Sequence, residues 1–248
     1  MSDLNKLIKE KNIKALILDM DGVVTITATL HAEAWKKMCD AFLRQRNEQE
    51  GKNYEPFKFV EDYREYVDGM PRLDGVRNFL WSRGISLPEG NQGDEAGFES
   101  VVGLGQMKNL YFLELLKQSG VEVFQDTVNW VREQKDNGMQ VAIVSASKNC
   151  FDVVRRAGVE NLFEARVDGL VASEMKLEGK PAPDIFLEAA NRLGVQPKEA
   201  AIFEDAWAGV AAGKAGEFGL VVGVDRASSK ELLEKHGADL VISSFTNA

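Results

Sequence analysis

The stretch from Lys14 to Thr27 reads KALILDMDGVVTIT and decides the fold. Its first part, Ala15 to Leu18, is a short apolar run, which is typical of a strand buried on both faces of a sheet. The run ends in Asp19-Met20-Asp21-Gly22. Side chains two positions apart in an extended chain point to the same side, so both carboxylates project together. Gly22 then allows the backbone to turn sharply.

Two carboxylates held side by side repel each other. At about 4 Å the repulsion is ~1 kcal/mol in water and ~4 kcal/mol at an effective dielectric constant of 20. We therefore expect a chain that brings Asp19 and Asp21 together at a buried strand end to hold a cation there. A strand followed by a polar turn is the alternative. An Asp-x-Asp-Gly motif alone does not separate the two, so the rest of the chain must supply partners for the site.

The composition limits the classes of protein to which the chain can belong. Its 248 residues suit one large or two smaller domains, and 44% apolar with 28% charged residues are typical of a soluble globular protein. The net charge of −9 argues against a nucleic-acid partner and an anionic membrane surface but is compatible with a phosphorylated metabolite. Cys39 and Cys150 form no disulfide framework, and we find no signal peptide and no membrane-spanning stretch. We expect a cytoplasmic monomer.

The second half of the sequence alternates between strand and helix patterns. We predict strands over 140–144, 167–171, 200–203, 220–224 and 240–242. Between them we predict helices over 126–137, 150–157 and 183–193, a helix of small residues after Phe203, and a helix over 228–236. Such alternation predicts a parallel sheet with helices on both faces.

The middle of the sequence lacks strand patterns. Helical spacing of apolar residues predicts helices over about 29–46, 76–84 and 106–118, and residues 85–105 read as a long irregular loop rich in glycine. The fold class is therefore α/β, with a Rossmann-like parallel-sheet core and an inserted helical cap. We assign residues 1–28 and 121–248 to the core and residues 29–120 to the cap.

Polar side chains follow the other predicted strands where each one ends. One strand is followed by Ser145-Ala146-Ser147-Lys148-Asn149, and another by Glu204-Asp205. Lys180 lies between them in a proline-rich turn. Each feature has a simpler interpretation, since Ser147 and the Glu204-Asp205 pair could merely cap helices and Lys180 could be a solvated surface lysine.

Taken together, these residues predict a phosphate site. The carboxyl ends of parallel strands meet at one edge of a sheet, where ligands bind. Hydroxyls and backbone N–H groups at a helix start bind anions. Oxygen ligands favour Mg²⁺, which prefers few carboxylates plus a substrate phosphate, and Lys180 can offset the charge of a transferring phosphoryl group.

The sequence resembles the haloacid dehalogenase superfamily of phosphotransferases, whose four motifs match Asp19-x-Asp21-Gly22-Val23, Ser145-Ala146-Ser147, Lys180 and Glu204-Asp205 in order. The resemblance implies that Asp19 is the nucleophile and Asp21 the general acid and base. It also implies Mg²⁺ held by Asp19, the backbone carbonyl of Asp21, and Asp205, with Glu204 close by. Phosphate would be bound by Ser145, Ala146, Ser147 and Lys180.

Within that superfamily the sequence is similar to the β-phosphoglucomutase-like branch. Thr27, His31 and Trp35 match its hinge threonine, the histidine that bonds the general acid, and the tryptophan that follows. Arg72 matches the cap arginine that holds the phosphate that is not transferred, and Lys108-Asn109 matches a cap pair facing the site. Asn149 matches as part of the Ser-Lys-Asn loop. We expect hinges at Thr27 and at about residues 117–125.

The predicted function is Mg²⁺-dependent phosphoryl transfer on a small sugar phosphate through an aspartyl-phosphate, as in a phosphosugar mutase. A sugar-phosphate phosphatase with the same residues is the alternative, in which water replaces the sugar hydroxyl as acceptor. A catalytically silent binding module is a third possibility, which any Mg²⁺-dependent turnover of an aryl phosphate would exclude.

Overall fold

The computed structural model describes residues 3–91, 93–226 and 229–246. The chain forms two compact units, one made of Met1–Ile26 and Val121–Ala248 and the other of Thr27–Gly120. The first crossing therefore lies at residues 26–27, whereas the sequence placed it at 28–29. We call the first unit the core and the second the cap, and describe each by itself.

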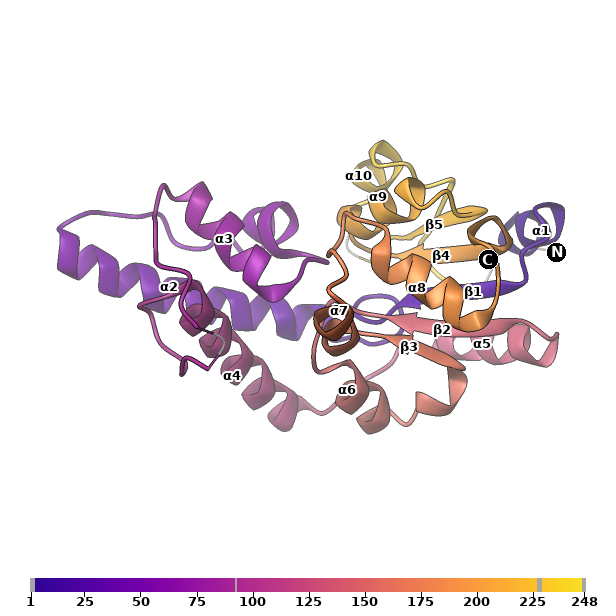
Figure 1. Cartoon of the computed structure of the whole chain (residues 1–248), viewed down its shortest axis with the longest axis horizontal. Helices are drawn as coiled ribbons and strands as arrows, with labels where there is room; N and C mark the ends of the chain where they lie inside the picture. Colours follow the sequence, from indigo (N-terminus) through magenta and orange to yellow (C-terminus); the bar gives the residue numbers. More distant parts are fainter. Residues whose placement is uncertain (1–2, 92, 227–228, 247–248) are drawn as a thin grey trace. The chain divides into compact units, whose positions relative to one another are not determined.

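The core contains a parallel sheet whose strand order is β3-β2-β1-β4-β5-β6 in the described part of the chain. Figure 1 labels β5, β4, β1, β2 and β3 in this order from top to bottom. Its strands are β1 (Ala15–Asp19), β2 (Gln140–Val144), β3 (Ala165–Val167), β4 (Ala200–Glu204), β5 (Leu220–Val224) and β6 (Leu240–Ile242). Because β1 pairs with both β2 and β4, its end lies in the middle of the sheet edge. The predicted α/β fold class is confirmed.

Helices connect these strands. They are α1 (Asp3–Glu10), α5 (Gln125–Asp136), α6 (Cys150–Arg156), α7 (Gly169–Met175), α8 (Asp184–Leu193), α9 (Trp207–Ala215) and α10 (Lys230–Lys235), with short 3₁₀ turns at η2 (Glu160–Leu162) and η3 (Pro197–Glu199). Residue 228, the predicted start of the last helix, lies outside the described residues. No described helix is both long enough and apolar enough to cross a membrane.

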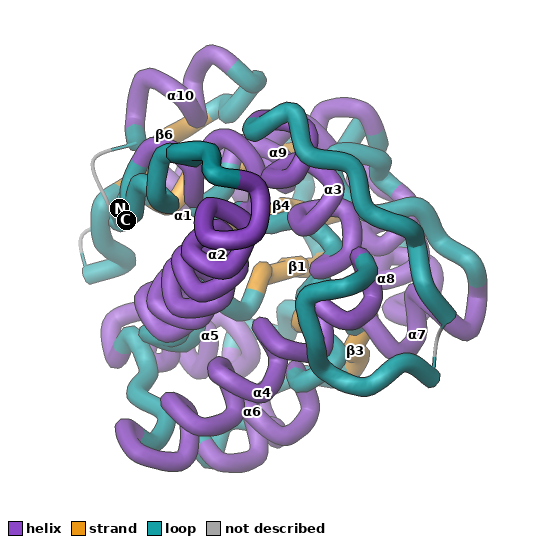
Figure 2. The backbone as a smooth tube through the Cα atoms, turned by 90° about the vertical axis from the view of Figure 1, so that its left-hand side faces the viewer, coloured by secondary structure: helices purple, strands orange, loops and turns teal. Residues whose placement is uncertain are grey.

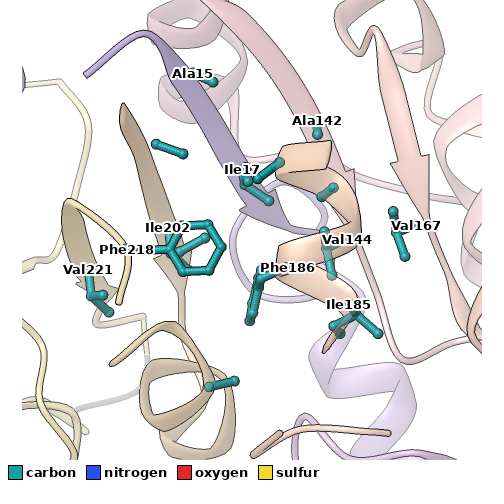
Figure 3. Close-up of a cluster of buried hydrophobic side chains, with 14 of the residues drawn as sticks. Ala15, Ile17, Ala142, Val144, Val167, Ile185, Phe186, Ile202, Phe218 and Val221 are labelled. Carbon is teal, nitrogen blue, oxygen red and sulfur yellow. The ribbon is translucent and has the colours of Figure 1, made fainter. Parts of the chain in front are cut away.

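The sheet is buried on both faces. On one face Ile17 and Ile202 pack against Phe186 of α8, and Figure 3 shows this cluster between the strands and α8. On the other face Trp130 of α5 lies against Phe203 of β4, with ring centroids 5.3 Å apart. Burying a large apolar side chain contributes roughly 1.5–3 kcal/mol, so these two layers hold the strand ends in fixed positions.

The two segments at which the chain leaves and re-enters the core are hydrogen-bonded to each other within the core. The amide of Ile26 donates to the carbonyl of Glu122, and that of Phe124 donates to Val24, each at 2.9 Å. The predicted second hinge, residues 117–125, spans the point where the chain re-enters the core at Val121. Hinge motion itself remains a prediction.

The cap is helical. It contains α2 (Ala28–Glu50), the π-helix η1 (Tyr63–Val67), α3 (Arg72–Ser82) and α4 (Val101–Ser119). The helices α2 and α4 pack against each other, and both can be followed in Figure 2. Buried aromatic side chains, among them Phe42 of α2 and Phe79 of α3, belong to one apolar cluster inside the cap.

Two predictions of local structure were wrong. Residues 167–171 are not a strand, because β3 ends at Val167 and α7 begins at Gly169, where the buried carboxylate of Asp168 accepts the amides of Leu170 and Val171. The irregular loop does not extend to residue 105. Residues 101–105 are the start of α4, whose N-cap is Ser100, and Gln92 within the loop lies outside the described residues.

Candidate active site

Asp19 is the centre of the candidate site. It ends β1, is 6% exposed, and has the Nζ of Lys180 at 2.5 Å from its Oδ1. Burial raises the pKa of the Asp19 carboxyl, and the charges of Glu204 and Asp21 add to that rise while Lys180 opposes it. A carboxylate here therefore depends on nearby positive charge.

Lys180 supplies that positive charge from a fully buried side chain. Its ammonium also donates to Oε1 of Glu204. Burial lowers the pKa of Lys180, but the charges of Asp19 and Glu204 outweigh this effect, so that the net pKa is raised. Lys180 is therefore an ammonium at neutral pH, and it joins the ends of β1 and β4.

Both carboxylate oxygens of Glu204 accept hydrogen bonds from residues of the core. While its Oε1 accepts from Lys180, its Oε2 accepts from the amide of Ala206 at 3.1 Å. A Cβ on Gly209 would lie 2.0 Å from the Glu204 carboxyl, so only glycine fits there. Sequence reasoning grouped Glu204 with the metal ligands, and that role remains a prediction. Gly209 was missed, and the only signal for it was its place in a helix of small residues.

The turn after β1 contains Asp21, and its Gly22 lies against the side chain of Asp205. Gly22 has φ +80°, and its amide donates to the carbonyl of Thr25 at 2.9 Å. A Cβ at Gly22 would lie 1.8 Å from Oδ2 of Asp205, so glycine is required for this close approach as well as for the turn. The half-buried Asp21 has its Oδ2 at 3.5 Å from the Oγ of Ser145, a long contact between the ends of β1 and β2.

Residues 145–149, the predicted phosphate-binding segment, are held by their own hydroxyls, and we call this segment the phosphate loop. The Oγ of Ser145 accepts from the amide of Ser147 at 3.0 Å, and the Oγ of Ser147 accepts from the amide of Asn149 at 3.1 Å. Ala146 lies between them and is half-buried. These bonds fix the two hydroxyls just before α6 begins, and hydroxyls at a helix start are typical of surfaces that bind anions.

The remaining predicted residues lie in the cap. Thr27 is fully buried directly before α2. In the first turns of α2, His31 stacks on Phe112 with centroids 4.0 Å apart. The nearly buried Lys108 of α4 places its Nζ 2.5 Å from the Nδ1 of His31 and 5.3 Å from the centre of the Trp35 ring. The structure therefore brings His31 and Lys108 together.

Arg72 begins α3 and is half-buried. Its Nη1 donates to the carbonyl of Gly105 at 3.1 Å, the only side-chain hydrogen bond of Arg72 among the described residues. Burial lowers the pKa of the Arg72 guanidinium. A guanidinium has five N–H donors. Most of the donors of Arg72 are therefore available to a ligand.

The donor set is compatible with a divalent cation. Four carboxylates, those of Asp19, Asp21, Glu204 and Asp205, share this edge of the sheet with Lys180, which leaves an excess of negative charge. Among residues 3–91, 93–226 and 229–246, no three His, Cys, Asp or Glu side chains form a complete metal site. The carboxylate oxygens fit Mg²⁺, which usually binds one or two protein carboxylates and completes its octahedron with waters and phosphate oxygens.

Comparisons with known proteins point to one family. Residues 13–216 match the haloacid dehalogenase-like hydrolases. A β-phosphoglucomutase of Mycobacterium bovis is 45% identical over 238 residues, which are 95% of this chain and 91% of that protein. A phosphorylated carbohydrates phosphatase of Thermotoga maritima is 28% identical over 92% of this chain and 94% of its own length. A crystal structure of β-phosphoglucomutase from Clostridium difficile has a TM-score of 0.72 at 27% identity and covers 94% of this chain and 92% of that one.

Proposed function

The chain belongs to the haloacid dehalogenase-like hydrolase family, and from that premise we propose that it transfers a phosphoryl group on a small sugar phosphate through a phosphorylated Asp19. The predicted resemblance to β-phosphoglucomutases is confirmed by the Mycobacterium bovis relative. The observation that carries the proposal is the buried carboxylate of Asp19, held at the end of the central strand by the ammonium of Lys180.

The reaction proceeds in two transfers. An oxygen of Asp19 attacks phosphorus, the bond from phosphorus to the sugar oxygen breaks, and Asp21 gives its proton to that leaving oxygen. In the second transfer Asp21 takes a proton from the acceptor hydroxyl. That hydroxyl oxygen attacks phosphorus, and the bond to Asp19 breaks. Asp21 ends the cycle protonated, as it began.

The surrounding residues stabilise the transferring group. Lys180 places a positive charge where negative charge develops on the phosphoryl oxygens, and Glu204 keeps that lysine in position. The hydroxyls of Ser145 and Ser147, held in place by amides of the same loop, would donate to the same oxygens. Asp19, the backbone carbonyl of Asp21, and Asp205 would hold Mg²⁺. Bound Mg²⁺ would neutralise the charge of the phosphoryl group and keep Asp19 ionised.

We favour a mutase over a phosphatase because of Arg72. A mutase must bind a bisphosphate in two orientations, so it needs a second phosphate site away from the reacting atoms. The guanidinium of Arg72 is held through one hydrogen bond and retains a fork of donors that matches a phosphate group. A sugar-phosphate phosphatase remains the second candidate, supported by the name of the Thermotoga maritima relative.

Replacing Arg72 by alanine separates the two candidates. Arg72→Ala removes a charge-assisted contact worth about 1.5–3 kcal/mol, so we expect mutase efficiency to fall about 10- to 150-fold. Hydrolysis of an aryl phosphate, which has no second phosphate, should barely change. Both activities are measured with the purified variant at saturating Mg²⁺.

The matched control is Arg77→Ala on the same helix. Arg77 is exposed and pairs with Asp74 and Glu89, so its loss should leave both activities unchanged. If Arg72→Ala lowers both activities equally, or lowers neither, then Arg72 does not bind a second phosphate and the phosphatase becomes the better proposal.

A further inference from the structure

Gly169 lies where the core segment that follows β3 meets the phosphate loop. Two hydrogen bonds join the backbones of these segments, because the amide of Ser145 donates to the carbonyl of Val167 and the amide of Gly169 donates to the carbonyl of Ser147, each at 3.1 Å. Val167 at the end of β3 and Gly169 at the start of α7 therefore both support the loop. None of the four sequence motifs includes them.

No side chain fits at Gly169. A Cβ there would lie 2.6 Å from the carbonyl oxygen of Ala146 and 2.9 Å from the amide nitrogen of Lys148. Both are backbone atoms, which cannot rotate away as the end of a side chain can. Gly169 is also not among the described residues with positive φ, so its backbone conformation is open to any residue. The requirement for glycine is therefore one of space alone.

The segment carrying Gly169 is also anchored by the side chain of Asp168. Asp168 is fully buried, and its Oδ1 accepts the amides of Leu170 at 3.0 Å and Val171 at 3.1 Å. Its Oδ2 lies 2.9 Å from the Nε of Arg166, an ion pair without the geometry of a hydrogen bond. Removing a buried carboxylate from such contacts is costly. A side chain at Gly169 would therefore displace the phosphate loop rather than α7.

We propose that Gly169, held by Asp168, is a positioning residue for phosphoryl transfer, which sets where Ser145–Asn149 present their amides and hydroxyls. This inference rests on the proposed function, since it takes that loop to bind the phosphate that is transferred. It adds the Asp168-Gly169 pair to the residues on which the reaction depends, although neither one touches the reacting atoms.

The test is Gly169→Ala, assayed with an aryl phosphate and with inorganic phosphate as competitive inhibitor. A displacement of about 1 Å in a positioning group can cost on the order of 100-fold, so we expect a loss of that size in kcat/KM. We also expect the inhibition constant of inorganic phosphate to rise about tenfold or more, the effect of losing one hydrogen bond to a charged group. Hydrolysis and mutase activity should fall together, unlike in Arg72→Ala.

Gly213→Ala is the matched control. Its Cβ would crowd the Val221 methyl groups at 3.1 and 3.2 Å inside the core, so it should lower the thermal unfolding temperature and leave the inhibition constant unchanged. Asp168→Asn is the second variant in case Gly169→Ala does not fold. It is nearly isosteric but weakens the contact with Arg166, and we expect it to raise the inhibition constant several-fold.

The outcomes separate this inference from the proposed function. A wild-type protein that turns over no phosphate ester overturns both. An active wild type whose inhibition constant is unchanged in a folded Gly169→Ala variant overturns the positioning role alone. If Gly169→Ala does not fold, an unchanged inhibition constant in Asp168→Asn overturns it.

Discussion

Asp19→Asn is expected to reduce phosphoryl transfer to background. An amide cannot accept the phosphoryl group, and the loss of a nucleophile costs about 10⁶-fold in kcat where it has been measured in another enzyme. The fold should survive because the change is nearly isosteric and Lys180 keeps its buried ion pair with Glu204. Turnover of an aryl phosphate and the thermal unfolding temperature, measured on the same preparation, test both expectations.

The control for this variant is Asp152→Asn in α6. That carboxylate is exposed, and among the described residues its ion pair is with Arg155 at the surface, so its removal should change neither activity nor stability. Turnover that persists in pure Asp19→Asn protein, above the level of any contaminating phosphatase, would rule out Asp19 as the nucleophile.

Asp21→Asn should produce a different defect. This variant keeps the nucleophile and loses proton transfer to the leaving oxygen, which is typically worth about 10²–10⁴-fold. The loss should be large for a sugar phosphate, whose alkoxide is a poor leaving group. It should shrink for an aryl phosphate, whose phenolate departs without a proton. The measurement compares kcat for the two substrates in the variant and the wild type.

An equal loss on both substrates would contradict the acid role of Asp21. In that case the contact between Asp21 and Ser145 would point to a structural role for the carboxylate in the turn after β1.

The strands that carry the site could be predicted because burial on both faces leaves a clear mark in the sequence. The runs at Ala15–Leu18 and Val141–Val144 are apolar and bounded by polar residues, and both lie in central strands. The edge strand β3 is short and half-exposed, so its pattern was weak and its position was mistaken. The apolar residues after Val167 had suggested that the strand continues, but the carboxylate of Asp168 caps the helix α7 there.

The spacing of the site residues in the sequence could not show which partner each carboxylate contacts. Glu204 and Asp205 are adjacent in sequence, but the former bonds to Lys180 and the latter lies against Gly22. Which carboxylate meets which partner depends on the turn after β4, and no local pattern encodes it. The same holds for Gly169, whose neighbours Ala146 and Lys148 are distant in sequence.

The most direct test of the account is to incubate the wild-type protein with β-glucose 1-phosphate, a trace of glucose 1,6-bisphosphate and Mg²⁺. Glucose 6-phosphate and free phosphate are then measured separately, with a parallel reaction in EDTA. We expect glucose 6-phosphate to accumulate far in excess of free phosphate and both products to disappear in EDTA. Free phosphate released without glucose 6-phosphate, or conversion that continues in EDTA, would contradict a Mg²⁺-dependent phosphosugar mutase.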